Sequence, residues 1–405
     1  MRHSNPKSAR AAAAATLLLG LFASSVSGQQ DSTTSIASSR PRSPESMALL
    51  SGPSGTDAPL FAQLEAQVSG AYDSTCGGWV AKNGIPSDAC VAFGFEFARR
   101  GGGGVWQDRA LATNEWTWSL FDSTGGGFFQ RLADTRHFDA SFHKPTDANA
   151  ARLENQLDAW HATGDAKYRT RARQVADFMD RVLLDGRGGF IDGQVGSRDL
   201  VPYSNGMAIH AWLEWAVASA DPVPRDFALR SLDRAWQEDW HAQLGMLHKD
   251  DFGVLQKAPQ LEDQIEMGRA YVLGSHVGGR AADLDRAKAI AALLESNFLD
   301  AKTGTWRTQA VPQKDGKIHP AASVADENAR AALFLAELAS VSGDARWRDA
   351  ARRSIQAYQK DFAKAGLDAG DWARAVQALA GADLPELPQW KEQTTQKSKQ
   401  ILRFK

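Results

Sequence analysis

The stretch Asp122-Ser-Thr-Gly-Gly-Gly-Phe128 decides the fold, because the chain repeats its pattern of an aspartate, glycines and an aromatic residue. Each copy follows an apolar, helix-like run, and the others are Asp73–Trp79, Asp185–Phe190 and the weaker Asp300–Trp306. Glycine lets a chain leave a helix through a left-handed residue, and the aromatic residue then anchors the loop. Recurrence at intervals of roughly fifty to sixty residues is typical of stacked helical hairpins. The aspartates of the phrase are therefore predicted to be structural.

A second repeated pattern indicates a structural unit of the same length. Asp147-Ala-Asn149 is followed by Asp165 in a Gly-Asp pair, and Asp326-Glu-Asn328 is followed at the same spacing by Asp344. The two copies lie 179 residues apart without slippage, which corresponds to three units of about sixty residues. Four such units, together with the earlier run from about Asp57, predict about six helical hairpins.

The hairpins predict an all-α toroid of the (α/α)6 type. Apolar residues at Ala150, Leu153, Leu157 and Trp160 form one helical stripe, and short Gly-Asp connections join antiparallel neighbours. Long loops between the pairs, at about 128–146, 188–204, 245–261 and 304–325, must all lie on one face. Loops of this length usually carry function, so this face is predicted to form a funnel around the inner-helix starts. These starts are placed at Asp147, Asn205, Asp263 and Asp326.

The two ends of the chain are predicted to lie outside the toroid. Residues 1–28 have a basic start, an apolar stretch and small residues, which is typical of a signal peptide. Residues 29–57 are rich in serine and predict a disordered tether, the toroid is expected over 58–390, and 391–405 form a polar tail. No later apolar run is long enough for a membrane span. The protein is therefore expected to be periplasmic or secreted.

Composition excludes some classes of partner and site. The 405 residues carry a formal net charge of −2 and no basic stretch, which argues against a nucleic-acid partner. Cys76 and Cys90 are predicted to form a disulfide or to be two idle thiols, since their spacing is too wide for a redox motif. No zinc-ligand pattern is present, and neither a metal nor a cofactor is predicted. The oligomeric state is left open.

One region resembles a known family. The run from Phe121 to Phe128, continuing through Asp134 to Phe142-His143-Lys144 and then Asn149-Ala150, resembles the helical domain of the thioredoxin-like family that includes spermatogenesis-associated protein homologues. The resemblance covers about Asp57 to Trp390 and implies a six-hairpin glycosidase-like fold, a group that also contains glucuronyl hydrolases and N-acylglucosamine epimerases. The chain lacks the thioredoxin domain of that family. It also has Ser141 and His143 where the family has His and Glu.

We therefore expect an exported carbohydrate-processing protein, of the glycoside hydrolase or sugar epimerase type, that binds a carbohydrate or another small polar ligand. Paired carboxylates or histidines supply acid–base chemistry on sugars. The predicted catalytic residues are Asp147, Asp263, Asp326 and His143, and the predicted substrate-binding residues are Asp134, Lys144, Asn149, Tyr203, Asn205, Glu262, Asn328 and Trp306. Two alternatives stay open. Each helix-start residue could be a simple N-cap, and the protein could be a non-catalytic glycan- or protein-binding module.

Overall fold

A computed structural model describes residues 57–131, 142–196, 198–248, 259–310 and 324–380 of the chain. The predicted signal peptide, almost all of the predicted tether and the polar tail lie outside these ranges, so they remain predictions. Within the described ranges, no helix is both long enough and apolar enough to cross a bilayer.

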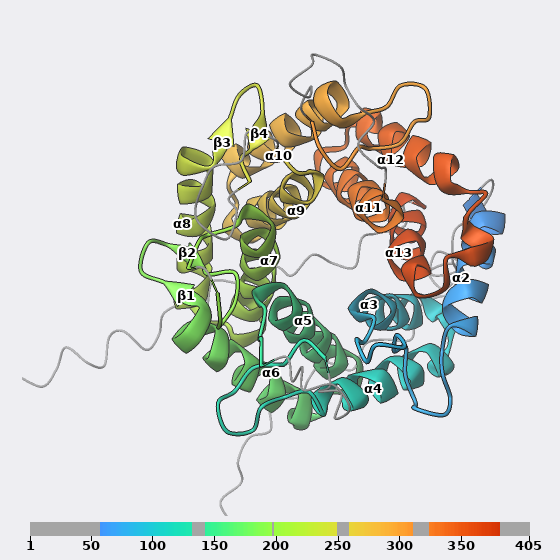
Figure 1. The fold of residues 1–405 in the computed structure, drawn as a ribbon, viewed down its shortest axis with the longest axis vertical. Helices are drawn as coiled ribbons and strands as arrows, with labels where there is room; N and C mark the ends of the chain where they lie inside the picture. The colour runs from blue at the N-terminus through green and yellow to red at the C-terminus, as the bar shows by residue number, and fades with distance from the viewer. Residues whose placement is uncertain (1–56, 132–141, 197, 249–258, 311–323, 381–405) are drawn as a thin grey trace, which may run out of the picture. The chain divides into compact units, whose positions relative to one another are not determined.

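Twelve α-helices of the described residues form a double ring, which confirms the predicted (α/α)6 toroid (Figure 1). Short π- and 3-10 turns extend several of the helices, and two-residue strands pair as β1 (Leu184–Asp185) with β2 (Gly189–Phe190) and β3 (Trp240–His241) with β4 (Gly245–Met246). The inner helices are α3 (Asp88–Phe97), α5 (Thr146–Thr163), α7 (Pro202–Ser219), α9 (Leu261–Gly278), α11 (Ala325–Ser342) and α13 (Ala369–Leu379). The outer helices are α2 (Ala58–Gly70), α4 (Gly104–Trp118), α6 (Ala166–Phe178), α8 (Pro222–Glu238), α10 (Ala281–Leu293) and α12 (Ala345–Tyr358).

The ring is closed by the two ends of the described chain. Inner helix α13 packs against α3 and against α2, so the sixth pair joins helices from opposite ends of the sequence. The Cys90 thiol on α3 donates to the carbonyl of Leu367 at 3.2 Å, and Arg374 of α13 pairs with Glu96 of α3 at 2.8 Å. Six helix pairs are therefore present, but only five of them are consecutive hairpins.

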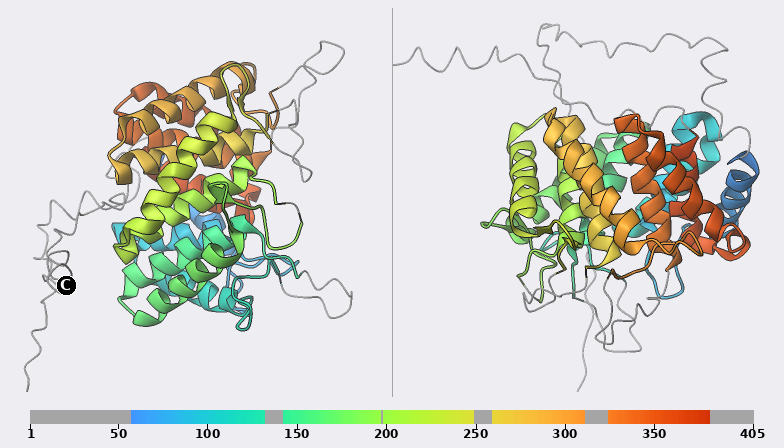
Figure 2. Two further views of the ribbon diagram at one scale, coloured as in Figure 1. Left: turned by 90° about the vertical axis from the view of Figure 1, so that its left-hand side faces the viewer. Right: turned by 90° about the horizontal axis from the view of Figure 1, so that it is seen from above.

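Within the hairpins, the connections are short and capped as their sequence predicts. Asp165, Asp221 and Asp344 each accept a hydrogen bond from the backbone N–H two residues later, which caps the outer helix. The inner helices α5, α9 and α11 end at glycines with positive φ, Gly164, Gly279 and Gly343. The longer connections between pairs gather on the opposite face, where the inner helices begin (Figure 2).

The repeated glycine phrase forms a small turn with a side-chain bond at its start. Asp122 Oδ1 accepts from the N–H of Thr124 at 2.9 Å, and Asp73, Asp185 and Asp300 accept from the residue two positions on in the same way. The chain then folds back, so that Phe121 bridges Phe128 and Leu299 bridges Trp306. These aspartates are structural, as predicted.

The aromatic end of each turn is held by an amide on the next inner helix, an arrangement that we call the amide clamp. In each clamp the side-chain oxygen accepts from the backbone N–H of the residue that ends the turn, and the side-chain nitrogen donates to the carbonyl of that residue and to the carbonyl four positions before the amide. The amide is always the fourth residue of its helix: Asn149 holds Phe128, Asn205 holds Phe190, Gln264 holds Met246 and Asn328 holds Trp306.

One more turn, the fourth in chain order, is not recognised in the sequence because three residue types change at once. In Trp240–Met246, His241 takes the place of the turn-opening aspartate, and its Nδ1 accepts from Gln243 N–H at 3.3 Å. Met246 takes the place of the aromatic residue, and the clamping amide is Gln264 rather than an asparagine. The hydrogen-bond pattern is nevertheless the same, so the physical constraint is preserved while the sequence phrase is lost.

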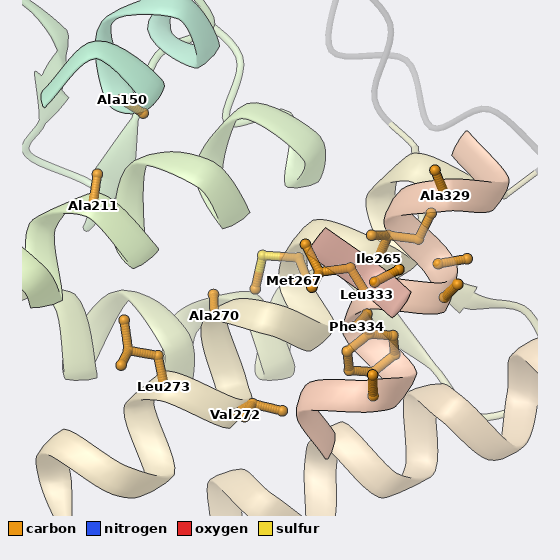
Figure 3. Packing of buried hydrophobic residues seen from close by; sticks show 14 of the residues in the cluster. Ala150, Ala211, Ile265, Met267, Ala270, Val272, Leu273, Ala329, Leu333 and Phe334 are labelled. Atoms are coloured by element: carbon orange, nitrogen blue, oxygen red, sulfur yellow. The ribbon is translucent and has the colours of Figure 1, made fainter. Parts of the chain in front are cut away.

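The core between neighbouring inner helices depends on close approach. A Cβ at Gly206 of α7 would lie 2.4 Å from the backbone carbon of Glu266, so this glycine lets α7 reach the backbone of α9. Gly268 of α9 similarly leaves room for the ring of Phe334 on α11. Ile265 and Met267 lie near Leu333 and Phe334 in this part of the core (Figure 3). The inner ring is therefore tightly packed.

The predicted disulfide is not formed. Cys76 is exposed in the first turn, whereas Cys90 is buried on α3, and both thiols are free. Burial raises the pKa of Cys90 to about 12, so it remains a neutral thiol at the inter-helix contact with Leu367. The idle-thiol alternative describes the two residues correctly.

Removing one clamp tests the proposed role of these amides in stability. Asn205→Ala should lower the free energy of unfolding by about 2 to 4 kcal/mol, because buried backbone groups at Phe190 and Val201 lose their partner. Urea unfolding followed by circular dichroism measures the change. Asn83→Ala, which removes a single exposed turn bond, is the matched control and should cost less than about 1 kcal/mol. Equal losses in both variants would contradict this role.

Candidate active site

A cavity of about 260 Å³ lies where α5, α7 and α9 begin. Its walls come from equivalent positions of successive units. They include the residue just before a helix (Pro145, Val201), the second residue of a helix (Asp147, Tyr203, Glu262) and the second residue after a clamped one (Gln130, Asp192, His248), together with His143. Because the clamps fix each loop on its helix, they also fix these side chains around one space.

His248 and Asp263 form a hydrogen-bonded pair at this cavity. The Nδ1 atom of His248 lies 2.8 Å from Asp263 Oδ2, and the N–H of Tyr203 donates to Asp263 Oδ1 at 2.9 Å. Asp263 is fully buried, and burial raises its pKa, but the two donors on its two oxygens favour the carboxylate. The hydrogen bond to Asp263 raises the pKa of His248. With Nδ1 held by the carboxylate, Nε2 of His248 is the nitrogen available to a ligand.

Tyr203 joins three inner helices at the cavity wall. Its hydroxyl donates to Asp147 Oδ2 at 3.5 Å, and the guanidinium of Arg330 lies over its ring at 5.5 Å from the centroid. Arg330 is itself paired with Glu266 at 3.0 Å. Burial raises the pKa of both Asp147 and Tyr203. The phenol is therefore a neutral donor directed at a carboxyl group that gains a proton more readily than an exposed aspartate.

Glu262 and Glu327 add two carboxyl groups from neighbouring helices. Burial raises the pKa of Glu262, and the nearby Asp263 raises it further. Burial and the charge of Glu262 raise the pKa of Glu327 to about 7, and its Oε2 is buried without a hydrogen-bond partner. A carboxyl group that titrates near neutrality can act as a general acid.

The structure brings together some of the predicted catalytic residues but not all of them. Asp147 and His143 line the cavity, and Asp263 lies behind its wall, bonded to His248 and Tyr203. Asp326 does not line it. Its side chain is 50% exposed and lies 3.9 Å from Arg330. None of the three aspartates is an N-cap, since the caps of α5, α9 and α11 are Pro145, Gln260 and Val324.

The predicted substrate-binding residues divide into two groups. Tyr203 and Glu262 line the cavity. The others are buried in structural roles: Asn149, Asn205 and Asn328 are clamps, Trp306 is a fully buried core residue, and Lys144 donates to Asp122 and to the Gly126 carbonyl at 2.7 Å each. Their polar groups face backbone and turn, so we assign them no contact with a ligand. Asp134 lies outside the described residues.

His248, which lines the cavity and pairs with Asp263, is the candidate site residue that sequence reasoning missed. The turn before it lacks both the aspartate and the aromatic residue of the repeated phrase, so its register was not recognised. Alignment of the turn Trp240–Met246 with the turn Asp185–Phe190 places His248 at the position of Asp192, two residues after the clamped one. This register could have identified His248 from the sequence.

Metal chemistry has no ready site in the described part of the chain. Within it, no three histidine, cysteine, aspartate or glutamate side chains are grouped so that they could hold a metal ion.

Comparison with known proteins identifies the fold but not a family. No family model matches the chain, and no curated protein matches it. Among solved structures, the chain is similar to a sugar epimerase from a ruminal bacterium (TM-score 0.63, 14% identity, 76% of this chain and 87% of that chain). It is also similar to a D-mannose isomerase (0.65, 13%, 80% and 98%) and to an unsaturated glucuronyl hydrolase specific for heparin (0.60, 12%, 80% and 97%). At these identities the likeness shows the six-hairpin glycosidase-like fold alone.

The His248–Asp263 pair predicts a specific titration. His248 should titrate above the ordinary value of about 6.5, and Asp263→Asn should lower that midpoint because the carboxylate is lost. Since the folded-state pKa is raised, the stability that the pair contributes is complete below the unfolded pKa and is lost as pH rises through the folded pKa. NMR titration of the imidazole protons measures the shift. Asp180→Asn on the outer surface is the control, and an unchanged midpoint in Asp263→Asn would contradict the assignment.

Proposed function

We propose that this protein is a carbohydrate-converting enzyme of the epimerase or isomerase type, in which His248 transfers a proton to and from a sugar in the cavity. The observation that carries the proposal is the geometry of His248, whose Nδ1 is held by buried Asp263 at 2.8 Å while the ring lines the cavity. A histidine fixed in this way is a positioned acid–base group with one free nitrogen.

The cavity residues suit proton transfer next to a carbonyl. In an open-chain sugar, the base removes the proton from the carbon beside the carbonyl group. The electron pair of the broken C–H bond forms a carbon–carbon double bond, and the carbonyl oxygen takes a proton from an acid. In epimerisation, the second acid–base group protonates the opposite face of the same carbon, and the added hydroxyl proton returns to the acid as the carbonyl re-forms. In isomerisation, the neighbouring carbon is protonated instead, and the other hydroxyl of the enediol loses its proton as the new carbonyl forms. His248 is the first base, and His143 lines the same cavity as a second acid–base group.

Glu262 is the acid that we assign to the carbonyl oxygen. It lines the cavity, and burial together with the charge of Asp263 raises its pKa, so that it holds a proton more readily than an exposed glutamate. The fold likeness to a sugar epimerase and to a D-mannose isomerase supports this class of reaction. Fold alone does not determine function, so the argument depends on the cavity.

Glycoside hydrolysis is a second candidate, favoured by a different observation. Asp147 and Glu262 are two carboxyl groups on the same cavity, both with raised pKa. Hydrolysis needs one protonated and one ionised carboxyl group on either side of the glycosidic bond. This reaction would not use the His248–Asp263 pair as its central acid–base group, so a histidine variant separates the two candidates.

Two further proposals concern origin and location. We infer from residues 1–28 that the protein is exported to the periplasm or beyond. We also propose that the ring is related to the helical domain of the thioredoxin-like, spermatogenesis-associated family. The Gly-Gly-Gly-Phe turn and Asn149, which clamp together in this chain, support that relationship.

Proton exchange with solvent tests the main proposal. Incubation with a panel of aldoses and ketoses in D₂O should incorporate deuterium at the carbon beside the carbonyl, detected by proton NMR and mass spectrometry. His248→Gln and Asp263→Asn should each reduce the rate at least 100-fold, because general acid–base catalysis contributes about 10²- to 10⁴-fold. Asp180→Asn should leave the rate unchanged.

The alternative outcomes are distinct. Release of new reducing ends from glycosides without deuterium incorporation would favour hydrolysis. Sugar binding without either reaction would favour the non-catalytic module.

A further inference from the structure

We propose that the cavity accepts one terminal sugar ring that carries no negative charge, and that it rejects uronates, sugar phosphates and internal residues of a chain. This inference rests on the proposed function and names its substrate class. Three features carry it, namely a closed floor, a small volume and the charge of the walls.

The floor is formed by charged side chains deeper in the ring, which we call the ion-pair belt: Glu96, Glu266, Arg269, Arg330, Glu337 and Arg374. Arg269 of α9 bonds Glu337 of α11 through two nitrogens at 3.1 Å each, and Arg330 of α11 returns to Glu266 of α9 at 3.0 Å. Arg374 joins α13 to α3 through Glu96. Glu154 of α5 also interacts electrostatically with both Arg269 of α9 and Arg374 of α13, so charged side chains approach one another across the space that the inner helices surround.

The belt lies directly below the cavity. Arg269 follows Glu262 by seven residues on α9, two helical turns along the same face and about 10 Å deeper. His210 follows Tyr203 by the same interval on α7 and pairs with Glu154 of α5 at 2.9 Å. Belt side chains are only 2 to 16% exposed, so the inner face of the ring at this depth is packed rather than open to solvent. A ligand can therefore enter from the loop face but cannot pass through.

The volume limits what enters. The cavity measures about 260 Å³. It lies below the about 300–1,000 Å³ of pockets for drug-sized ligands. One sugar ring fits such a space, whereas a bound internal residue would need exits for the chain on both sides. The closed floor removes one of these exits.

The walls disfavour an anionic sugar. Asp147, Asp192 and Glu262 line the cavity, and none of the nine described lining residues is a lysine or arginine. Recognition of carboxylate or phosphate groups normally uses those two residue types. The two arginines beside these walls are already engaged: Arg152 donates to the carbonyls of Phe129 and Gln130, and Arg330 is paired with Glu266 and lies over the Tyr203 ring. A uronate would therefore lose water without gaining a lysine or arginine partner from the described walls.

Pairs of sugars that differ only in charge test directly whether the cavity prefers an uncharged ring. Isothermal titration calorimetry with D-mannose against D-mannuronate, and D-glucose against D-glucuronate, compares rings that differ only in the C6 group. The neutral member of the better-binding pair should bind at least tenfold more tightly. Asp192→Asn removes one charge from the cavity wall at a residue to which we assign no catalytic role. It should reduce the ratio of neutral-sugar to uronate affinity at least threefold. Asp180→Asn is the matched surface control and should leave the ratio unchanged.

Chain length tests the closed floor. Linear oligosaccharides of the better-binding hexose should gain little affinity beyond the disaccharide, because only the terminal ring enters. A tenfold gain with each residue up to the tetrasaccharide would overturn the single-ring claim. Uronates that bind as tightly as neutral sugars would overturn the charge claim while the proposed function stands. Absence of binding by every sugar would overturn the proposed function and this inference together.

Discussion

The amide clamp is the interaction on which the rest of this structure depends. A long connection returning to an inner helix has no regular sheet or helix to fix its register. A single buried amide solves that problem, because it pairs with one residue of the loop through both N–H and C=O and also satisfies a carbonyl at the start of its own helix. Four clamps at the same helical position therefore place four loops in equivalent registers around the ring.

The cavity follows from this register. Residues two positions after the clamped one, and the second residue of each helix, face a shared space in three neighbouring units. The repeat thus creates equivalent positions in each unit, and different residue types at those positions give them different chemistry. Gln130, Asp192 and His248 are equivalent in register but differ in chemical type. In the next unit, Asp326 is equivalent to Asp147 yet is half exposed and ion-paired, so equivalence of position alone does not make a site.

Sequence reasoning predicted the fold well because the fold is a repeat. Glycine turns, Gly-Asp connections and the spacing of Asn149 and Asn328 depend on local chemistry that a sequence shows directly. It failed where a role depends on distant partners. Asn149 and Lys144 looked like ligand contacts, but both are used by backbone and turn groups of the preceding loop. His248 was missed because its importance comes from Asp263, on a separate helix, and because its turn has lost the usual residues. The closure of the ring by α2 and α13 likewise has no local signal.

The charged groups of the inner ring have two separate uses. Deep in the ring they are paired between helices and close the central space. At the cavity, burial raises the pKa of Asp147 and Glu262, and it also raises the pKa of Glu327 on the next inner helix. A histidine positioned by a buried carboxylate, beside carboxyl groups with raised pKa, is the combination that an acid–base site requires.

A crystal structure of the protein with the best-binding neutral hexose would test the central claim most directly. The account predicts one sugar ring in the cavity where α5, α7 and α9 begin, with its first two carbons within about 3.5 Å of His248 Nε2. The contact between His248 Nδ1 and Asp263 should be intact. A sugar bound elsewhere, for example in the hollow beside Trp118 and Arg171 on the outer wall, with the cavity filled by water, would contradict it.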